Sequence, residues 1–137
     1  LLMLTFCYSS RRPGTKHDCN GTSRFSQGLN NMIEMINFSK GDNNLLPTIA
    51  QDYKTKEILM LAYMNKDALK ATLESGFAHY WSRSRKKLWM KGETSGNTQK
   101  IIEIKVDCDF DSILVIVDQK GPACHNETYT CFTTKLL

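Results

Sequence analysis

Apolar side chains recur along this chain in short runs and in alternation, a pattern typical of β-strands. Residues 58–63 and 113–117 are almost wholly apolar and predict buried strands. Residues 102–109 alternate between apolar and charged side chains, which predicts a strand with Cys108 on its apolar face and the neighbouring aspartates on the other. Further strands are expected at residues 47–51 and 77–84, and a short helix at residues 31–38.

Residues 66–75 predict the main helix of the chain. Asn65 is a favourable N-cap residue, and Gly76 suits the left-handed position that follows a helix. The expected buried stripe of this helix consists of Ala68, Leu69 and Leu73.

Size and charge restrict the class of protein. A chain of 137 residues is long enough for one domain with its own core. The net charge is +4, but residues 1–30 hold four basic residues and one acid, or +3, which leaves only +1 for the rest. The rest is therefore not a general nucleic-acid binder, and no apolar run approaches the roughly 20 residues of a membrane span. Five cysteines without a secreted spacing favour reduced thiols in the cytoplasm.

The N-terminal residues 1–31 differ from the rest in being rich in Ser, Gly and Arg. This composition suits a transit peptide, a disordered extension or translation from upstream of the true start. Cys7, His17 and Cys19 are a weak candidate metal cluster, because their flanks lack strand or helix periodicity. We therefore expect residues 1–31 to be a non-domain extension and residues 32–137 to form a single domain.

Metal-binding side chains are concentrated in residues 107–132. Three thiols there offer the soft ligands that select zinc, and three alternating carboxylates offer hard ligands for magnesium, calcium or manganese. Three zinc ligands leave a position for water, as in catalytic sites, so the pattern predicts a two-metal hydrolase. Taken singly, each cysteine is more often a core residue, and an Asp-x-Asp-x-Asp run is usually a solvated turn. The candidate ligands are Cys108, Cys124 and Cys131 for zinc and Asp107, Asp109 and Asp111 for the harder ion.

Five basic residues lie between Arg83 and Lys91. Arg83, Arg85 and Lys91 are candidates for binding phosphate, and the hydroxyl-rich loop that follows adds Ser95. The lysines between them are expected in a charged hairpin turn. Trp81 and Trp89 could stack on a base, although a half-buried tryptophan in a sheet is commoner. A second function class is therefore a zinc-stabilised module that binds single-stranded nucleic acid.

Six sequence blocks in order resemble the phosphoribosyl-AMP cyclohydrolase family of histidine biosynthesis. The blocks are Ile49-Ala-Gln-Asp52, Leu59-Met-Leu-Ala-Tyr-Met-Asn65, Trp81-Ser-Arg-Ser-Arg85, Leu88-Trp-Met-Lys-Gly-Glu-Thr-Ser-Gly-Asn97, Asp107-Cys-Asp-Phe-Asp111 and Gly121-Pro-Ala-Cys-His125 with Cys131-Phe132. The family usually has Gly where this chain has Phe110, and Thr-Gly where it has Asn126-Glu127. Neither departure removes a candidate ligand.

The resemblance implies a fold, two metals and an assembly. The fold is α+β and β-dominated, with a curved mixed sheet or partly open barrel and one main helix. The three cysteines would hold zinc, Zn2+, in a site shared between the two subunits of a homodimer. The three aspartates would hold magnesium, Mg2+.

The implied reaction is hydrolytic opening of the adenine ring of N1-(5-phosphoribosyl)-AMP. Zinc lowers the pKa of water to ~7, and the water attacks C6 before the N1–C6 bond breaks. His125 is the candidate base, and His79 is a weaker one. Magnesium and the basic residues would hold the two phosphates of this small-molecule substrate; neither nucleic acid nor a membrane is expected as a partner.

Overall fold

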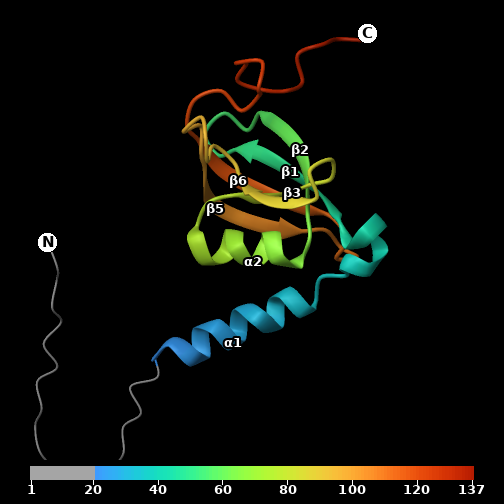
Figure 1. Ribbon diagram of the computed structural model, residues 1–137, viewed down its shortest axis with the longest axis vertical. Helices are drawn as coiled ribbons and strands as arrows, with labels where there is room; N and C mark the ends of the chain where they lie inside the picture. The colour runs from blue at the N-terminus through green and yellow to red at the C-terminus, as the bar shows by residue number, and fades with distance from the viewer. Residues whose placement is uncertain (1–20) are drawn as a thin grey trace, which may run out of the picture.

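The computed structural model describes residues 21–137, with side chains from Ser26 onward. The described chain is strand-dominated and of the α+β class, as predicted (Figure 1). Its elements are α1 Gly21–Glu34, the 3-10 turns η1 Phe38–Lys40 and η2 Asp42–Asn44, β1 Leu46–Asp52, β2 Ile58–Met64, α2 Lys66–Ser75, β3 His79–Ser82, β4 Lys87–Met90, β5 Gln99–Val106 and β6 Ile113–Gln119.

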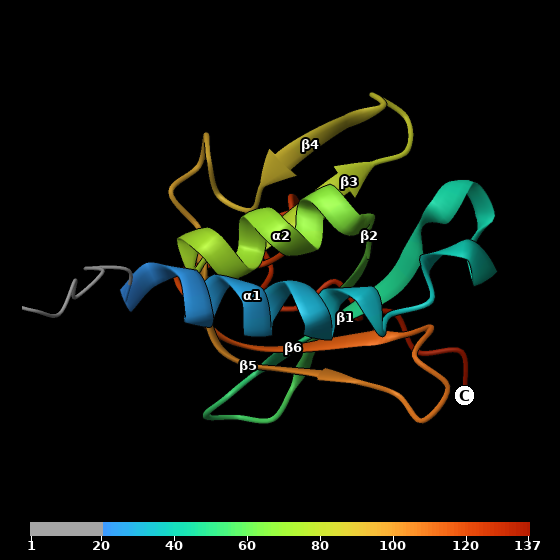
Figure 2. The same cartoon turned by 90° about the horizontal axis from the view of Figure 1, so that it is seen from below.

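The strands form a mixed sheet of order β2-β1-β6-β5 and a separate β3–β4 hairpin. β1 and β6 are parallel, whereas the other neighbours in the sheet are antiparallel. The sheet is mixed, as predicted, and it is not closed into a barrel. Figure 2 shows α1 and α2 side by side, with the sheet on one side of them and the hairpin beyond α2.

One face of the sheet carries the core. In β1 the buried positions alternate, and Leu46 and Ala50 face the α2 residue Leu69 and the β3 residue Tyr80 in a single buried cluster. Tyr80 is wholly buried, and its hydroxyl donates to Gln99 Oε1 at 2.6 Å. A buried phenol thus keeps a hydrogen-bond partner while its ring joins the sheet to the hairpin.

The predicted main helix has the expected bounds. Asn65 Oδ1 accepts the Ala68 N–H at 2.8 Å, and Gly76 follows in the left-handed region at φ 77°. Ala68 and Leu69 are buried as predicted, and Thr72 joins them because its hydroxyl accepts the His79 N–H at 2.9 Å.

Other sequence predictions were wrong in detail. The helix expected at residues 31–38 instead begins at Gly21 and ends at Glu34. The domain boundary expected after residue 31 lies within this helix and stays a prediction. The strand expected at residues 77–84 is shorter, because the chain turns after Ser82. Residues 58–63 do form a strand, but Leu61 is 47% exposed, since among the described residues only one face of the sheet is covered.

The prediction that Cys108 continues a strand was also wrong. β5 ends at Val106, and Asp107 Oδ1 accepts the N–H groups of Asp111 and Ser112 at 2.9 and 3.1 Å, which closes a tight loop. Cys108 is therefore exposed in a loop rather than placed on an apolar strand face.

Two further sequence predictions concern a metal cluster near the N-terminus and membrane-spanning segments. The weak candidate cluster of Cys7, His17 and Cys19 lies outside the described residues. Among residues 21–137, every helix is too short or too polar to cross a membrane.

Candidate metal centres and substrate cavity

The loop between β5 and β6 brings the three predicted carboxylates together. One ligand oxygen from each of Asp107, Asp109 and Asp111 lies within 4.8 Å of the others. Phe110 makes this possible by adopting a left-handed conformation at φ 60°. Convergent carboxylates of this kind are the donor set that suits a hard divalent cation. They form the one such cluster of three found among the described residues.

The carboxylates differ in their affinity for protons. Desolvation opposes ionisation of Asp107, but the hydrogen bonds from the Asp111 and Ser112 backbones outweigh it and lower the pKa of Asp107 to about 2. Desolvation and the hydrogen bonds with Asp107 and Asp109 raise the pKa of Asp111. The neighbouring carboxylates repel one another, and a nearby cation reduces that repulsion. Among the described residues, the Lys40 ammonium lies 3.1 Å from Asp109 Oδ2.

Two of the three predicted zinc thiols meet after β6. The thiols of Cys124 and Cys131 are close enough for each to influence the ionisation of the other. The Cys131 N–H donates to Leu59 O at 2.8 Å, which fixes this segment beside β2. Hydrogen bonds from the Asn126 backbone and from Thr128 lower the pKa of Cys124. A thiol with a lowered pKa is more readily present as the thiolate that binds metals.

Cys108 does not join the other two cysteines within one chain. Cys108 follows β5 at the edge of the sheet where β6 begins, next to the first residues of β1. Cys131 is hydrogen-bonded through its backbone to Leu59 of β2, which lies beside the last residues of β1, at the opposite edge. The structure thus brings together two of the three predicted zinc ligands and separates the third.

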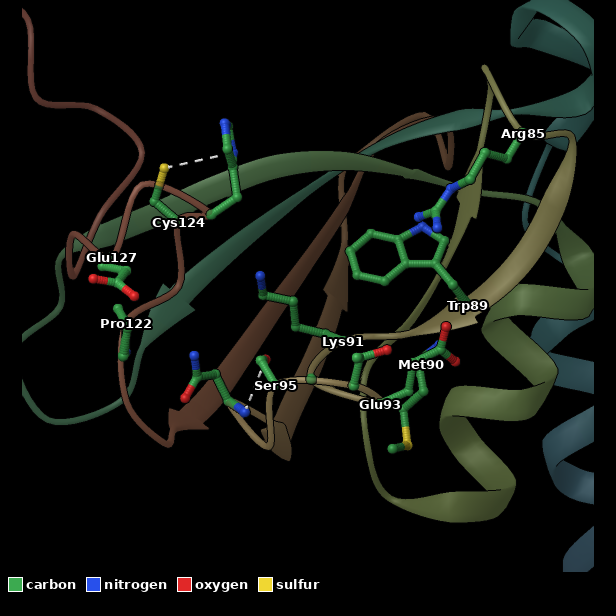
Figure 3. A pocket seen from close by; sticks show the side chains of 13 residues that line it. Arg85, Trp89, Met90, Lys91, Glu93, Ser95, Pro122, Cys124 and Glu127 are labelled. Atoms are coloured by element: carbon green, nitrogen blue, oxygen red, sulfur yellow. Dashed lines mark hydrogen bonds between the residues drawn. The ribbon is translucent and has the colours of Figure 1, made fainter.

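A cavity of about 380 Å³ opens beside Cys124. Figure 3 shows Lys91 between Cys124 and Trp89 in this cavity, with Arg85 beyond the indole ring. The cavity walls include five of the predicted site residues, namely Arg85, Lys91, Ser95, Cys124 and His125. His125 Nδ1 lies 3.9 Å from Cys124 Sγ. A thiol, an imidazole and two cationic side chains therefore surround one space.

Lys91 is the most deeply placed cation of that cavity. Its ammonium donates to Ala123 O and lies 5.9 Å from the centre of the Trp89 ring. Burial lowers the pKa of Lys91, although the two cysteines oppose this effect. The Trp89 ring packs against Tyr80, with centroids 5.5 Å apart, so one of the two predicted stacking tryptophans already has an aromatic partner within the fold.

Arg83 and His79 lie outside this cavity. The Arg83 guanidinium stacks on Tyr63 at 4.0 Å from the ring centre and lines a different hollow with Lys40. His79 Nδ1 is 2.8 Å from Phe77 O, at the start of β3. The predicted phosphate ligands are thus divided between two places. Sequence reasoning missed Lys40, because nothing local links it to carboxylates that follow it by 69 and 71 residues.

Comparison with known proteins identifies the family. The family model described as phosphoribosyl-AMP cyclohydrolase matches residues 60–133. A phosphoribosyl-AMP cyclohydrolase of Archaeoglobus fulgidus is 62% identical over 95 residues, which cover 69% of this chain and 88% of the relative. The chain belongs to the phosphoribosyl-AMP cyclohydrolase family.

Other relatives agree. A phosphoribosyl-AMP cyclohydrolase of Clostridium botulinum is 58% identical over 100 residues, covering 73% of this chain and 91% of the relative. A histidine biosynthesis bifunctional protein of Pyrococcus furiosus is 54% identical over 108 residues, covering 79% of this chain but 51% of that longer protein. Membership of the cyclohydrolase family therefore agrees with the resemblance of the six sequence blocks.

The two departures from the cyclohydrolase pattern fall on unusual backbone positions. Phe110 and Glu127 stand where the family usually has Gly, and their φ angles are 60° and 63°. The backbone thus keeps conformations that Gly adopts without strain, although both residues here carry a Cβ.

Proposed function

We propose that this chain hydrolyses the adenine ring of N1-(5-phosphoribosyl)-AMP in histidine biosynthesis, with zinc and magnesium as cofactors. Family membership supports the reaction class, and the pairing of Cys124 with Cys131 beside a cationic cavity is the observation that carries the proposal. A substrate with two phosphates and an electron-poor ring fits a site that combines cations with metal ligands.

Zinc would be held by Cys124 and Cys131 of one subunit and by Cys108 of the other. The two neighbouring thiols fit the soft ligand set of zinc, and the separation of Cys108 within the chain is the reason to invoke a homodimer. Apolar side chains on the open face of the sheet support such an assembly: Ile49 of β1 and Leu61 of β2 are exposed and lie opposite each other, and the half-buried Leu114 of β6 lies on the other side of Ile49.

Magnesium would be held by Asp107, Asp109 and Asp111, whose convergent oxygens fit a hard cation. In a dimer with a shared zinc site, this loop of one subunit lies next to the cavity of the other, because Cys108 belongs to the same loop. The complete site would then combine residues of both chains.

When bound, zinc would supply Lewis-acid chemistry that lowers the pKa of a water molecule, so that the water can lose a proton at neutral pH and its oxygen can attack C6. His125, on the cavity wall beside Cys124, would accept the proton of that water. Arg85, Lys91 and Ser95 would bind one phosphate in this cavity. Arg83 would bind the second phosphate from its separate hollow.

The first test follows the ultraviolet change that accompanies ring opening, together with zinc content. Cys108→Ala, Cys124→Ala and Cys131→Ala should each lose zinc and activity, whereas the control Cys19→Ala should keep both. His125→Ala should keep zinc and lose rate. Full activity in any one of the three zinc variants would remove that residue from the ligand set. Salt-dependent retention on single-stranded DNA without ring opening would favour the nucleic-acid module instead.

The second test addresses sharing of the zinc site. Homodimers of Cys108→Ala and of Cys124→Ala should each be inactive. After dissociation and random re-association, half of the dimers are mixed and half of their sites are intact, so about a quarter of wild-type activity should return. No recovery, with mixed dimers confirmed by mass spectrometry, would place all three ligands within one subunit.

A further inference from the structure

The carboxylates of the loop between β5 and β6 are already paired with a cationic side chain of the same chain, Lys40. Lys40 Nζ lies 3.1 Å from Asp109 Oδ2 and 3.4 Å from Asp111 Oδ2, and it also contacts the Asp109 backbone oxygen at 3.4 Å. Asp109 and Asp111 both belong to the carboxylate cluster that fits a divalent ion. The ammonium and the ion would therefore compete for the same two carboxylate groups.

The position of Lys40 is supported by a second contact to the same loop. The Asn37 N–H donates to Phe110 O at 2.8 Å, so the turn η1 is attached to the loop by its backbone as well as by the lysine. This backbone bond does not involve the carboxylates. It would remain when the lysine side chain moves, and it would keep the ammonium within reach of the cluster.

Lys40 borders two hollows into which its side chain could move. On one side it borders a hollow with Asp111 and Ser112, and on the other it borders the hollow of about 450 Å³ that contains Arg83. The larger hollow is also lined by Asp42 and Asn43, so an ammonium released from the carboxylates can turn into it, next to polar groups, and leave the carboxylates to the ion. Both Lys40 and Asp109 are exposed, so their ion pair is weak enough for a divalent ion to displace it.

We propose that Lys40 competes with the divalent cation: its ammonium offsets part of the negative charge of the carboxylate cluster before the ion binds, and it must leave the carboxylates when the ion arrives. This inference rests on the proposed magnesium site. Lys40 thus acts on ion binding through the carboxylates, which it occupies until an ion displaces it. Removing it should strengthen ion binding about three- to tenfold, the range expected for one or two exposed ion pairs.

The test is a titration with Mn²⁺, whose free form is measured by electron paramagnetic resonance, on the purified full chain. Lys40→Gln should bind Mn²⁺ with a dissociation constant about three- to tenfold lower than that of the wild type. Lys70→Gln is the matched control, because it removes the same charge from another exposed pair, with Glu74 on α2. It should bind Mn²⁺ as the wild type does.

Equal or weaker Mn²⁺ binding by Lys40→Gln would overturn the inference while leaving the magnesium site in place. Asp109→Asn tests the magnesium site separately from the role of Lys40. If this variant binds Mn²⁺ as tightly as the wild type, Asp109 is not a metal ligand, and both the magnesium site and the role of Lys40 fail. Circular dichroism of each variant checks that a changed affinity does not reflect a changed fold.

Discussion

Replacement of Glu127 by Gly should stabilise the protein. Glu127 has a φ of 63°, and its N–H donates to Cys124 O at 3.0 Å, so the turn behind the cysteine depends on this left-handed residue. A residue with a Cβ loses about 1–2 kcal/mol in this conformation. Gly avoids that loss but costs about 0.5–1 kcal/mol in backbone entropy. The difference favours Glu127→Gly by about 0.5–1 kcal/mol.

The exposed side chain of Glu127 makes no hydrogen bond or ion pair within residues 26–137, so its removal should not offset this gain. Thermal unfolding at one protein concentration and equal zinc content should show a Tm increase of about 2–4 °C for a chain of this size. Glu127→Ala is the control, because it removes the carboxylate and keeps the Cβ. A Glu127→Gly protein no more stable than Glu127→Ala would refute the argument that backbone strain is stored here.

Four other changes give contrasting outcomes. Phe110→Gly should lower the free energy of unfolding by about 1–2 kcal/mol in denaturant titration. The ring lines an apolar hollow, and the free energy lost with its apolar contacts exceeds the strain energy relieved at φ 60°. Asn65→Ala should cost about 1 kcal/mol through the lost helix cap, measured in the same way. Leu69→Ala should cost about 2–5 kcal/mol, since this side chain is 1% exposed. A chain beginning at Met32 should fold and catalyse the reaction like the full chain, because it keeps Ile33, the one buried side chain among residues 26–34 of α1; loss of soluble protein or a large fall in activity would contradict this.

Elements with local signals were predictable from the sequence. α2 has its bounds fixed by Asn65 and Gly76, and both signals act within a few residues of the helix. The apolar run of β6 likewise identified a strand that is buried between two neighbours. By contrast, α1 has no acidic residue in its first turn and no basic residue in its last, and its buried residue Ile33 contacts elements far along the chain. Where α1 begins and ends therefore depends on tertiary contacts, which the local sequence pattern does not reveal.

The Asp107 loop shows a different limit of sequence reasoning. Alternation alone continued the strand through Cys108, because a period of two does not reveal where a backbone turns. The turn depends on one carboxylate oxygen that accepts two N–H groups and on the left-handed Phe110. The sequence therefore indicated the three aspartates as candidate ligands and offered a turn only as the alternative to a metal site, whereas in the structure it is the turn that brings the carboxylates together.

The separation of the cysteines leads to the argument for a dimer. Bringing Cys108 to Cys131 within one chain would move the loop across the sheet, from the end where β6 begins to the end where β2 begins. That movement would break the pairing of β5 with β6, which runs from Gln99 opposite Gln119 to Val106 opposite Ile113, and would expose the buried residues of β6. A second subunit can supply Cys108 without losing any of these contacts. For this reason we propose that the three zinc ligands come from two subunits, and recovery of activity in mixed dimers tests that proposal directly.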